Sequence, residues 1–159
     1  MIKIAFALAL AALTLAPARG SPMEARATIT ALGMPVMLAK ASSKGPATGP
    51  WSERPIALSV EPLRSLDASQ VATEAARRMV EQAGLPQEKA DSFQALLAKA
   101  QTFEPGTSLA GSCGSAPTLT LSHGADKLAM GDAQTALAFC SIWLSPSGNK
   151  ELRDGLGLP

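Results

Sequence analysis

Few residues of this 159-residue chain are of the types that perform chemistry. The chain has one histidine, His123, so any acid–base or Cys–His mechanism must use this imidazole. A serine and a glycine flank His123, which is the setting of a turn residue. The stretch GSCGS around Cys113 has the outline of a nucleophile loop, but small residues at a strand end are ordinary turn chemistry. We therefore predict no catalytic residue in either place.

The N-terminus has the form of a signal peptide. Lys3 precedes an uncharged apolar run from Ile4 to Ala16, and Ala16-Pro17-Ala18 follows as a small-x-small cleavage site. A membrane anchor, the alternative, needs about 20 apolar residues, and this run breaks at Pro17. We predict a signal peptide over 1–18, one domain over 19–159, a periplasmic or secreted protein and no membrane span after cleavage.

The predicted export affects the expected redox state of the two cysteines, Cys113 and Cys140. Thiols outside the cytosol tend to oxidise, and an even count favours pairing, so the sequence predicts a Cys113–Cys140 disulfide. Two buried free thiols or one reactive cysteine are the alternatives. Two cysteines and one histidine are too few for a structural zinc site, and we predict no metal and no cofactor.

Charge and composition exclude several classes of function. The chain carries 14 Lys+Arg against 13 Asp+Glu, and removal of residues 1–18 takes away Lys3 and leaves a balanced charge. No basic run is longer than Arg77-Arg78, so nucleic acid is not an expected partner. With 47% hydrophobic and 17% charged residues, the chain can bury a core, which excludes a disordered protein.

Helical patterns occupy the middle of the chain. Asp67 and Gln70 have capping-box spacing at the start of a predicted helix over 67–83, which Gly84 ends. A second helix begins after Leu85-Pro86. On the first helix, acidic and basic residues lie three or four positions apart and indicate a solvated charge face: Glu74, Arg77, Arg78 and Glu81.

Strand patterns lie on both sides of these helices. The stretch over 27–38 is compatible with a strand broken by a turn or bulge at Gly33 and Pro35, and 41–50 reads as a loop. Period-two alternation predicts strands over 55–61 and 118–122. A further strand is expected over 107–113, and 127–130 is expected to return as the hairpin partner of 118–122. Asp132 precedes a third helix with a predicted core-facing stripe: Ala133, Ala136, Leu137, Cys140, Trp143 and Leu144.

Strands and helices come in clusters and do not alternate strictly. This order is typical of an α+β fold, with a largely antiparallel sheet packed by helices on one face. The predicted disulfide would then join the third helix to the end of a strand. We see no internal repeat.

A family resemblance rests on the order of features after Glu104. A Pro105-Gly106 turn leads into a strand, a hairpin surrounds His123-Gly124, a helix ends in Ile142-Trp143-Leu144, and the charged segment KELRDGL follows. This part is similar to the C-terminal part of bacterial exported chalcone isomerase-like proteins, and Leu63-Arg64 resembles their Leu-Arg pair. The resemblance implies an open-faced antiparallel sheet with an apolar cleft between sheet and helices.

The resemblance also bears on activity. Plant isomerases of this family use an Arg on an early strand and a Tyr that orients a water. Arg26 is the residue that matches the Arg, and the chain has no Tyr. The family's isomerase site is therefore incomplete.

Three functional hypotheses follow. The first is a non-catalytic exported protein that binds an apolar or amphipathic small molecule such as a fatty acid, with Leu32, Val36 and Leu38 as candidate ligand-binding residues. The second is an intramolecular lyase or isomerase in which Arg26 or Arg64 stabilises an oxyanion. The third is a periplasmic interaction domain without a ligand. The sequence does not predict the oligomeric state.

Overall fold

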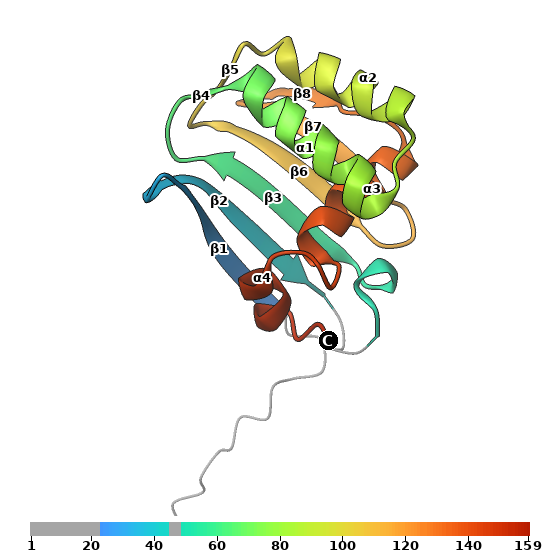
Figure 1. Ribbon diagram of the computed structural model, residues 1–159. Helices are drawn as coiled ribbons and strands as arrows, with labels where there is room; N and C mark the ends of the chain where they lie inside the picture. Colours follow the sequence, from blue (N-terminus) through green and yellow to red (C-terminus); the bar gives the residue numbers. More distant parts are fainter. Residues whose placement is uncertain (1–22, 45–48) are drawn as a thin grey trace, which may run out of the picture.

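A computed structural model describes residues 23–44 and 49–159, so the predicted signal peptide over 1–18 lies outside the described residues. Its main element is a six-stranded antiparallel sheet with the strand order β1-β2-β3-β6-β7-β8 (Figure 1). The strands are β1 (Met23–Ala31), β2 (Met34–Ser43), β3 (Ile56–Pro62), β6 (Thr107–Cys113), β7 (Thr118–His123) and β8 (Asp126–Ala129). A separate two-stranded ribbon pairs β4 (Leu66–Asp67) with β5 (Thr102–Phe103).

The helices gather on one face of the sheet (Figure 1). They are α1 (Ala68–Ala83), α2 (Gln87–Ala98), α3 (Ala133–Leu144) and α4 (Lys150–Gly155), with a 3-10 turn η1 (Trp51–Glu53) before β3. No helix in the described ranges has both the length and the apolar character of a membrane span. The expected α+β class, with an antiparallel sheet covered on one face, is therefore confirmed.

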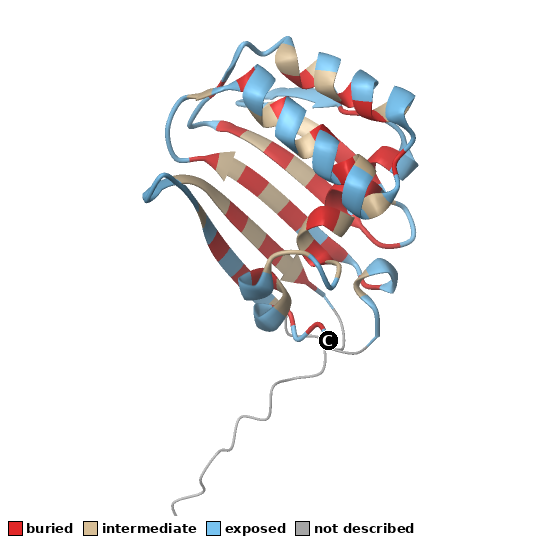
Figure 2. Ribbon diagram, viewed as in Figure 1, coloured by how far each residue is buried: buried red, intermediate tan, exposed pale blue. Residues whose placement is uncertain are grey.

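Period-two alternation determines which side of each strand is covered. On β3, the side chains of Ile56, Leu58 and Val60 are at most 2% exposed, whereas Ala57 between them is exposed. Figure 2 shows this alternation as red bands across the central strands. Because successive side chains point to opposite faces, one face of the sheet packs against the helices and the other stays accessible.

The first helix begins and ends where the sequence predicts. The Asp67 carboxylate accepts hydrogen bonds from the backbone N–H groups of Ser69 at 2.8 Å and Gln70 at 3.2 Å. At the other end Gly84 adopts φ 68°, a left-handed conformation that glycine reaches without steric cost. Its backbone N–H donates to the carbonyl groups of Met79 and Val80, so the last turn of α1 is satisfied.

The N-terminal region differs from its prediction. The interrupted strand over 27–38 is a complete β1–β2 hairpin, with Leu32 (φ 52°) and Gly33 (φ 77°) at its tip and a register shift between Ile29 and Thr30. The loop predicted from Ala41 was wrong for its first three residues, because β2 continues through Ser43. These residues are small, but the ladders to β1 and β3 determine their conformation.

The predicted stripe on α3 was too narrow and partly misplaced. Ala133 and Leu137 are exposed, whereas residues outside the stripe are buried: Thr135, Ala138, Phe139 and Ile142. Helix α3 contacts β6 and β7 on one side and α1 and α2 on another. A helix between two layers buries a wider arc than the single stripe of a surface helix.

The predicted disulfide is present. Cys113 at the end of β6 and Cys140 in α3 form an S–S bond of 2.08 Å with a Cα–Cα distance of 6.1 Å. Neither sulfur is therefore a free thiol. The bond attaches α3 covalently to a strand inside the sheet.

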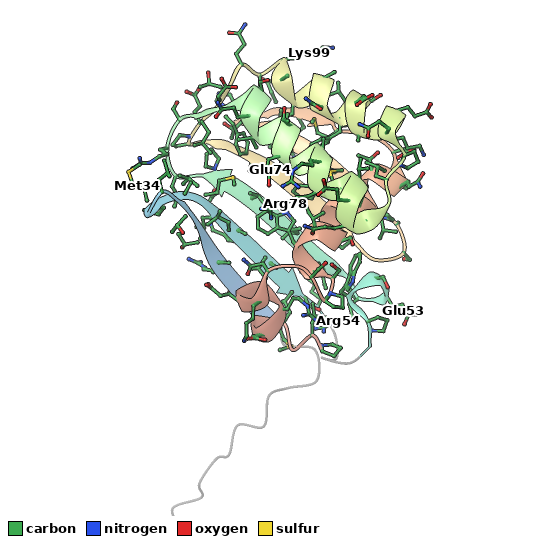
Figure 3. The ribbon with its side chains drawn as sticks, in the orientation of Figure 1. Met34, Glu53, Arg54, Glu74, Arg78 and Lys99 are labelled. Carbon is green, nitrogen blue, oxygen red and sulfur yellow. A yellow bond between two sulfur atoms is a disulfide. The ribbon has the colours of Figure 1, made fainter. Side chains whose placement is uncertain are left out.

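A buried arginine connects the C-terminal segment to the sheet. The Arg54 guanidinium, in a residue that is 4% exposed, donates from Nη2 to the Leu156 carbonyl at 2.8 Å and to Ser43 Oγ at 3.3 Å. Figure 3 shows Arg54 at the end of the molecule where α4 meets the β1–β2 pair. No described carboxylate pairs with this cation, so its contribution is to hold the segment after α4 in place.

Replacement of both cysteines by alanine (C113A/C140A) should lower the free energy of unfolding by about 3.5 kcal/mol, because the cross-link closes a loop of 27 residues in the unfolded chain. Urea denaturation of the oxidised protein and of the double variant measures this difference. Reduced wild-type protein is the control and should resemble the variant. Equal stability of oxidised and reduced protein would contradict the expected role of the bond.

Asp132 gives a pH-dependent prediction. Its carboxylate caps α3 by accepting from the Thr135 N–H at 2.9 Å, and it accepts from Lys89 Nζ at 2.7 Å. The Lys89 hydrogen bond and the Thr135 N–H lower the pKa of Asp132 to about 2. Since the unfolded pKa is higher, the ionised carboxylate stabilises the fold above about pH 4, and this stabilisation disappears as the pH falls towards 2.

The variant Asp132→Asn keeps a cap acceptor but loses the charge. It should unfold at lower urea concentration than wild type at pH 7, and the two midpoints should converge between about pH 4 and pH 2. In a Lys89→Met background the Asp132→Asn effect should shrink, since the partner cation is gone. A gap that stays constant down to pH 2 would contradict this assignment.

Candidate ligand-binding cavity

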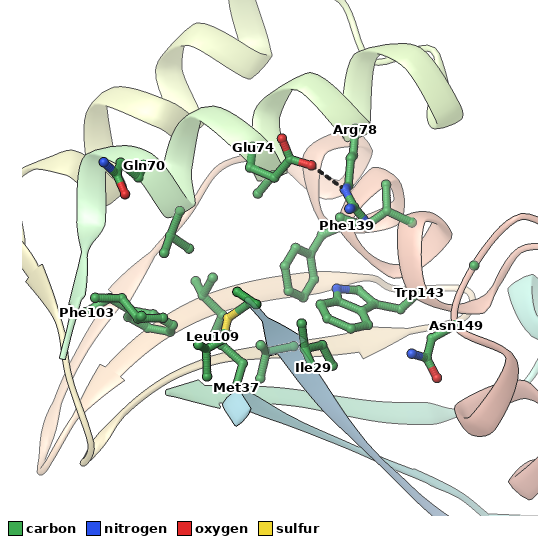
Figure 4. Close-up of a pocket in the computed structure, with 18 of the residues that line it drawn as sticks. Ile29, Met37, Gln70, Glu74, Arg78, Phe103, Leu109, Phe139, Trp143 and Asn149 are labelled. Carbon is green, nitrogen blue, oxygen red and sulfur yellow. Dashed lines mark hydrogen bonds and ion pairs between the residues drawn. The ribbon is translucent and has the colours of Figure 1, made fainter. Parts of the chain in front are cut away.

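A cavity of about 550 Å³ lies between the inner face of the sheet and helices α1 and α3. Its volume is within the range of small-molecule sites, which are concave and mostly apolar. Figure 4 shows the lining side chains converging from α1, from α3 and from the strands.

The floor and far end of the cavity are apolar. The six-stranded sheet contributes residues from four strands, and helices α1 and α3 contribute aliphatic and aromatic side chains. Phe103 of β5 lies at one end of the cavity (Figure 4), and Leu66, which pairs with it from β4, also lines the cavity. The apolar residues of these walls are Ile29, Ala31, Val36, Met37, Val60, Leu109, Val71, Ala75, Phe139, Ile142 and Trp143. Such a lining favours a ligand with a hydrocarbon or aromatic body.

Charged groups lie on the α1 rim of the cavity. Arg78 Nε donates to Glu74 Oε1 at 2.8 Å, and Arg77 also donates to Glu74, at 2.7 Å from Nη2. Hydrogen bonds from Arg77 and Arg78 lower the pKa of Glu74, so this carboxylate is ionised at neutral pH. Glu74 and Arg78 line the cavity, and Figure 4 shows the Arg78 side chain extending from α1 towards Phe139 and Trp143.

The indole of Trp143 forms part of the wall contributed by α3. Its ring packs at a tilt against Phe139, with the two centroids 6.4 Å apart. Its Nε1 atom is buried and has no hydrogen-bond partner among the described residues. A buried donor without a partner costs about 1–3 kcal/mol, so this N–H is a feature that a ligand could satisfy.

The loop after α3 holds this end of the cavity in shape. The Asn149 N–H donates to the Trp143 carbonyl at 2.8 Å, which folds the chain back against the helix. A Cβ at Gly148 would collide with the same carbonyl, so only glycine permits this approach. Asn149 also caps α4, because its Oδ1 accepts from the Leu152 N–H at 3.0 Å. One loop therefore positions both Trp143 and α4.

The three residues predicted to bind a ligand have different positions. Val36 lines the cavity. Leu38 lies on β2 next to Met37, whose side chain faces the cavity, and is not among the lining residues. Leu32 is 98% exposed at the tip of the β1–β2 hairpin. The structure therefore brings one of the three to the site.

The two candidate catalytic arginines do not line the cavity. Arg26 is exposed on β1 opposite Lys40 of β2. Arg64 follows β3, is exposed, and has Nη1 3.4 Å from the sulfur of Met34. His123 lies at the end of β7 and is also exposed, and the disulfide occupies both cysteines.

The residues that sequence reasoning missed as site residues are Trp143, Arg78 and Glu74. Trp143 was assigned to the core, and the two charged residues to a solvated helix face. The ion pairs of that face are present, including Arg77 with Glu81 at 2.6 Å, but one edge of it also borders the cavity. Within 23–44 and 49–159, no three His, Cys, Asp or Glu side chains come together as a metal site requires.

Comparisons with known proteins add no family assignment. The sequence matches no protein-family model and no curated protein. The chalcone isomerase-like resemblance therefore remains a prediction from sequence features.

Proposed function

We propose that this chain is an exported, non-catalytic protein of chalcone isomerase-like fold that binds an apolar or amphipathic small molecule, such as a fatty acid, between its sheet and helices. The observation that carries the proposal is the cavity of about 550 Å³ with an apolar floor and a polar rim. Burial of a hydrocarbon chain there gains about 0.8 kcal/mol per methylene, which is the main source of affinity in such a site.

The position of the arginines favours binding over catalysis. An isomerase of the family type needs a cation beside the reacting oxygen, and the two arginines proposed for that role, Arg26 and Arg64, lie outside the cavity lining. The arginine that does line the cavity, Arg78, is on helix α1 and not on an early strand. The chain also has no Tyr to orient a water. The proposed periplasmic or secreted location rests on the signal-peptide pattern and is compatible with the disulfide.

Blocking the cavity should abolish binding. Ala75 is half-buried on α1 and lines the cavity, so Ala75→Phe would fill the space that a ligand occupies. Titration calorimetry with palmitate should show binding to wild type and a loss of about tenfold or more in the variant. Ala95→Phe is the matched control, because Ala95 is exposed on α2, outside the lining, and should bind as wild type does.

The milder Ala75→Leu variant should show an intermediate loss, and thermal unfolding establishes that each variant folds. Native mass spectrometry of protein purified from the periplasm, followed by organic extraction, should reveal a co-purified lipid. The proposal is overturned if wild-type protein purifies without a lipid and binds neither palmitate nor hexadecanol. Turnover of a chalcone by the wild-type protein would also overturn it.

A further inference from the structure

We propose that the cavity selects ligands with a carboxylate headgroup, which binds between the Arg78 guanidinium and Trp143 Nε1, while the hydrocarbon tail extends towards Phe103. This inference rests on the proposed function and adds the headgroup class and the orientation of the ligand. Neither residue belongs to the set that the sequence predicted for ligand binding or catalysis.

The first observation is that both groups only donate hydrogen bonds. Trp143 Nε1 is buried and has no partner among the described residues, so a ligand atom that meets it must be an acceptor. Arg78 approaches the same end of the cavity from α1 (Figure 4). An indole N–H and a guanidinium together suit an anionic acceptor better than a hydroxyl group.

The second observation is the hydrogen-bonding state of Arg78. Its contact with Glu74 uses Nε, and no hydrogen bond joins either of its Nη atoms to another described residue. Glu74 is shared with Arg77, which contacts it through Nε at 3.2 Å and Nη2 at 2.7 Å. Arg78 therefore keeps two N–H-bearing nitrogens for a ligand, and a carboxylate can accept from both nitrogens of such a fork.

The third observation is the polarity gradient along the cavity. Asn149 lies at the end of the cavity next to Trp143, and Phe103 lies at the opposite end (Figure 4). Ser147 belongs to the same loop after α3 as Asn149, and Leu66 pairs with Phe103 between β4 and β5. Gln70 is the one polar residue of α1 near the Phe103 end, and it is exposed. An amphiphile that places its headgroup near Trp143 leaves its tail against the apolar floor.

The test compares two probes of equal chain length, palmitate and hexadecanol, by titration calorimetry at neutral pH. Wild type should bind palmitate about tenfold more tightly than hexadecanol. Arg78→Gln should weaken palmitate by about tenfold and leave hexadecanol within about twofold. Trp143→Phe keeps an aromatic ring but removes the donor, and it should weaken palmitate by about fivefold.

Arg77→Gln is the matched control. Arg77 is adjacent in sequence and contacts the same Glu74, but it does not line the cavity. This variant should bind palmitate as wild type does. Glu74→Gln removes the competing carboxylate and should strengthen palmitate binding, whereas it would weaken binding if the site selected a cationic headgroup.

The outcomes separate the two proposals. If wild type binds both probes with equal affinity, or if Arg78→Gln leaves palmitate affinity unchanged, the headgroup inference is wrong and the binding function stands. If wild type binds neither probe, the proposed function fails, and the headgroup inference fails with it. Thermal unfolding of each variant verifies that a lost affinity is not a lost fold.

Discussion

The packing of α3 against the sheet is the constraint on which the rest of the molecule depends. This helix has no charged residue between Ala133 and Leu144, and most of its surface is buried. It touches β6 and β7 beneath it, α1 and α2 beside it, and α4 after it. The disulfide attaches it to the end of β6, so its position does not depend on apolar contacts alone. Asp132 satisfies its first turn, and the fold-back of Asn149 onto Trp143 secures its end.

The cavity follows from this arrangement. Helix α1 packs mainly against α2 and α3, so it does not pack directly on strands β1 and β2. At the other end of these strands the side chains are small, and an added Cβ at Gly155 would lie 2.6 Å from the Cβ of Ala25, so α4 sits directly on the strand. Towards the hairpin tip, no helix in the described part of the chain packs on these strands in this way, and Ile29 and Met37 line the cavity. The cavity is the space that remains between α1 and the sheet, both of which pack against α3.

Sequence reasoning recovered what local patterns determine. The features that were predicted correctly depend on neighbouring residues or on the oxidising compartment of an exported protein. They are the cap at Asp67, the end of α1 at Gly84, the strands after Thr107 and the cysteine pair. The β1–β2 hairpin was not predicted because its tip is Leu32-Gly33. A leucine with positive φ is not the Asn-Gly or Asp-Gly signal that identifies such a turn in a sequence. The role of Arg78 could not be predicted, because helical spacing pairs it with Glu74 but does not show which edge of α1 borders a cavity. Of the residues on this hairpin that were predicted to bind a ligand, Val36 lines the cavity, and Leu38 and Leu32 do not.

The chemistry of the cavity wall favours retention of a ligand over its conversion. Proton transfer at neutral pH needs a group that titrates near that pH, and among the described lining residues the ionisable side chains are Glu74 and Arg78. The two arginines lower the pKa of Glu74, which makes this carboxylate a weak base, and a guanidinium does not release its proton. Trp143 contributes a donor that neither accepts nor transfers a proton. The proposed carboxylate ligand already carries its charge when it binds, so fixed donors beside it would contribute to its affinity and not to a rate enhancement.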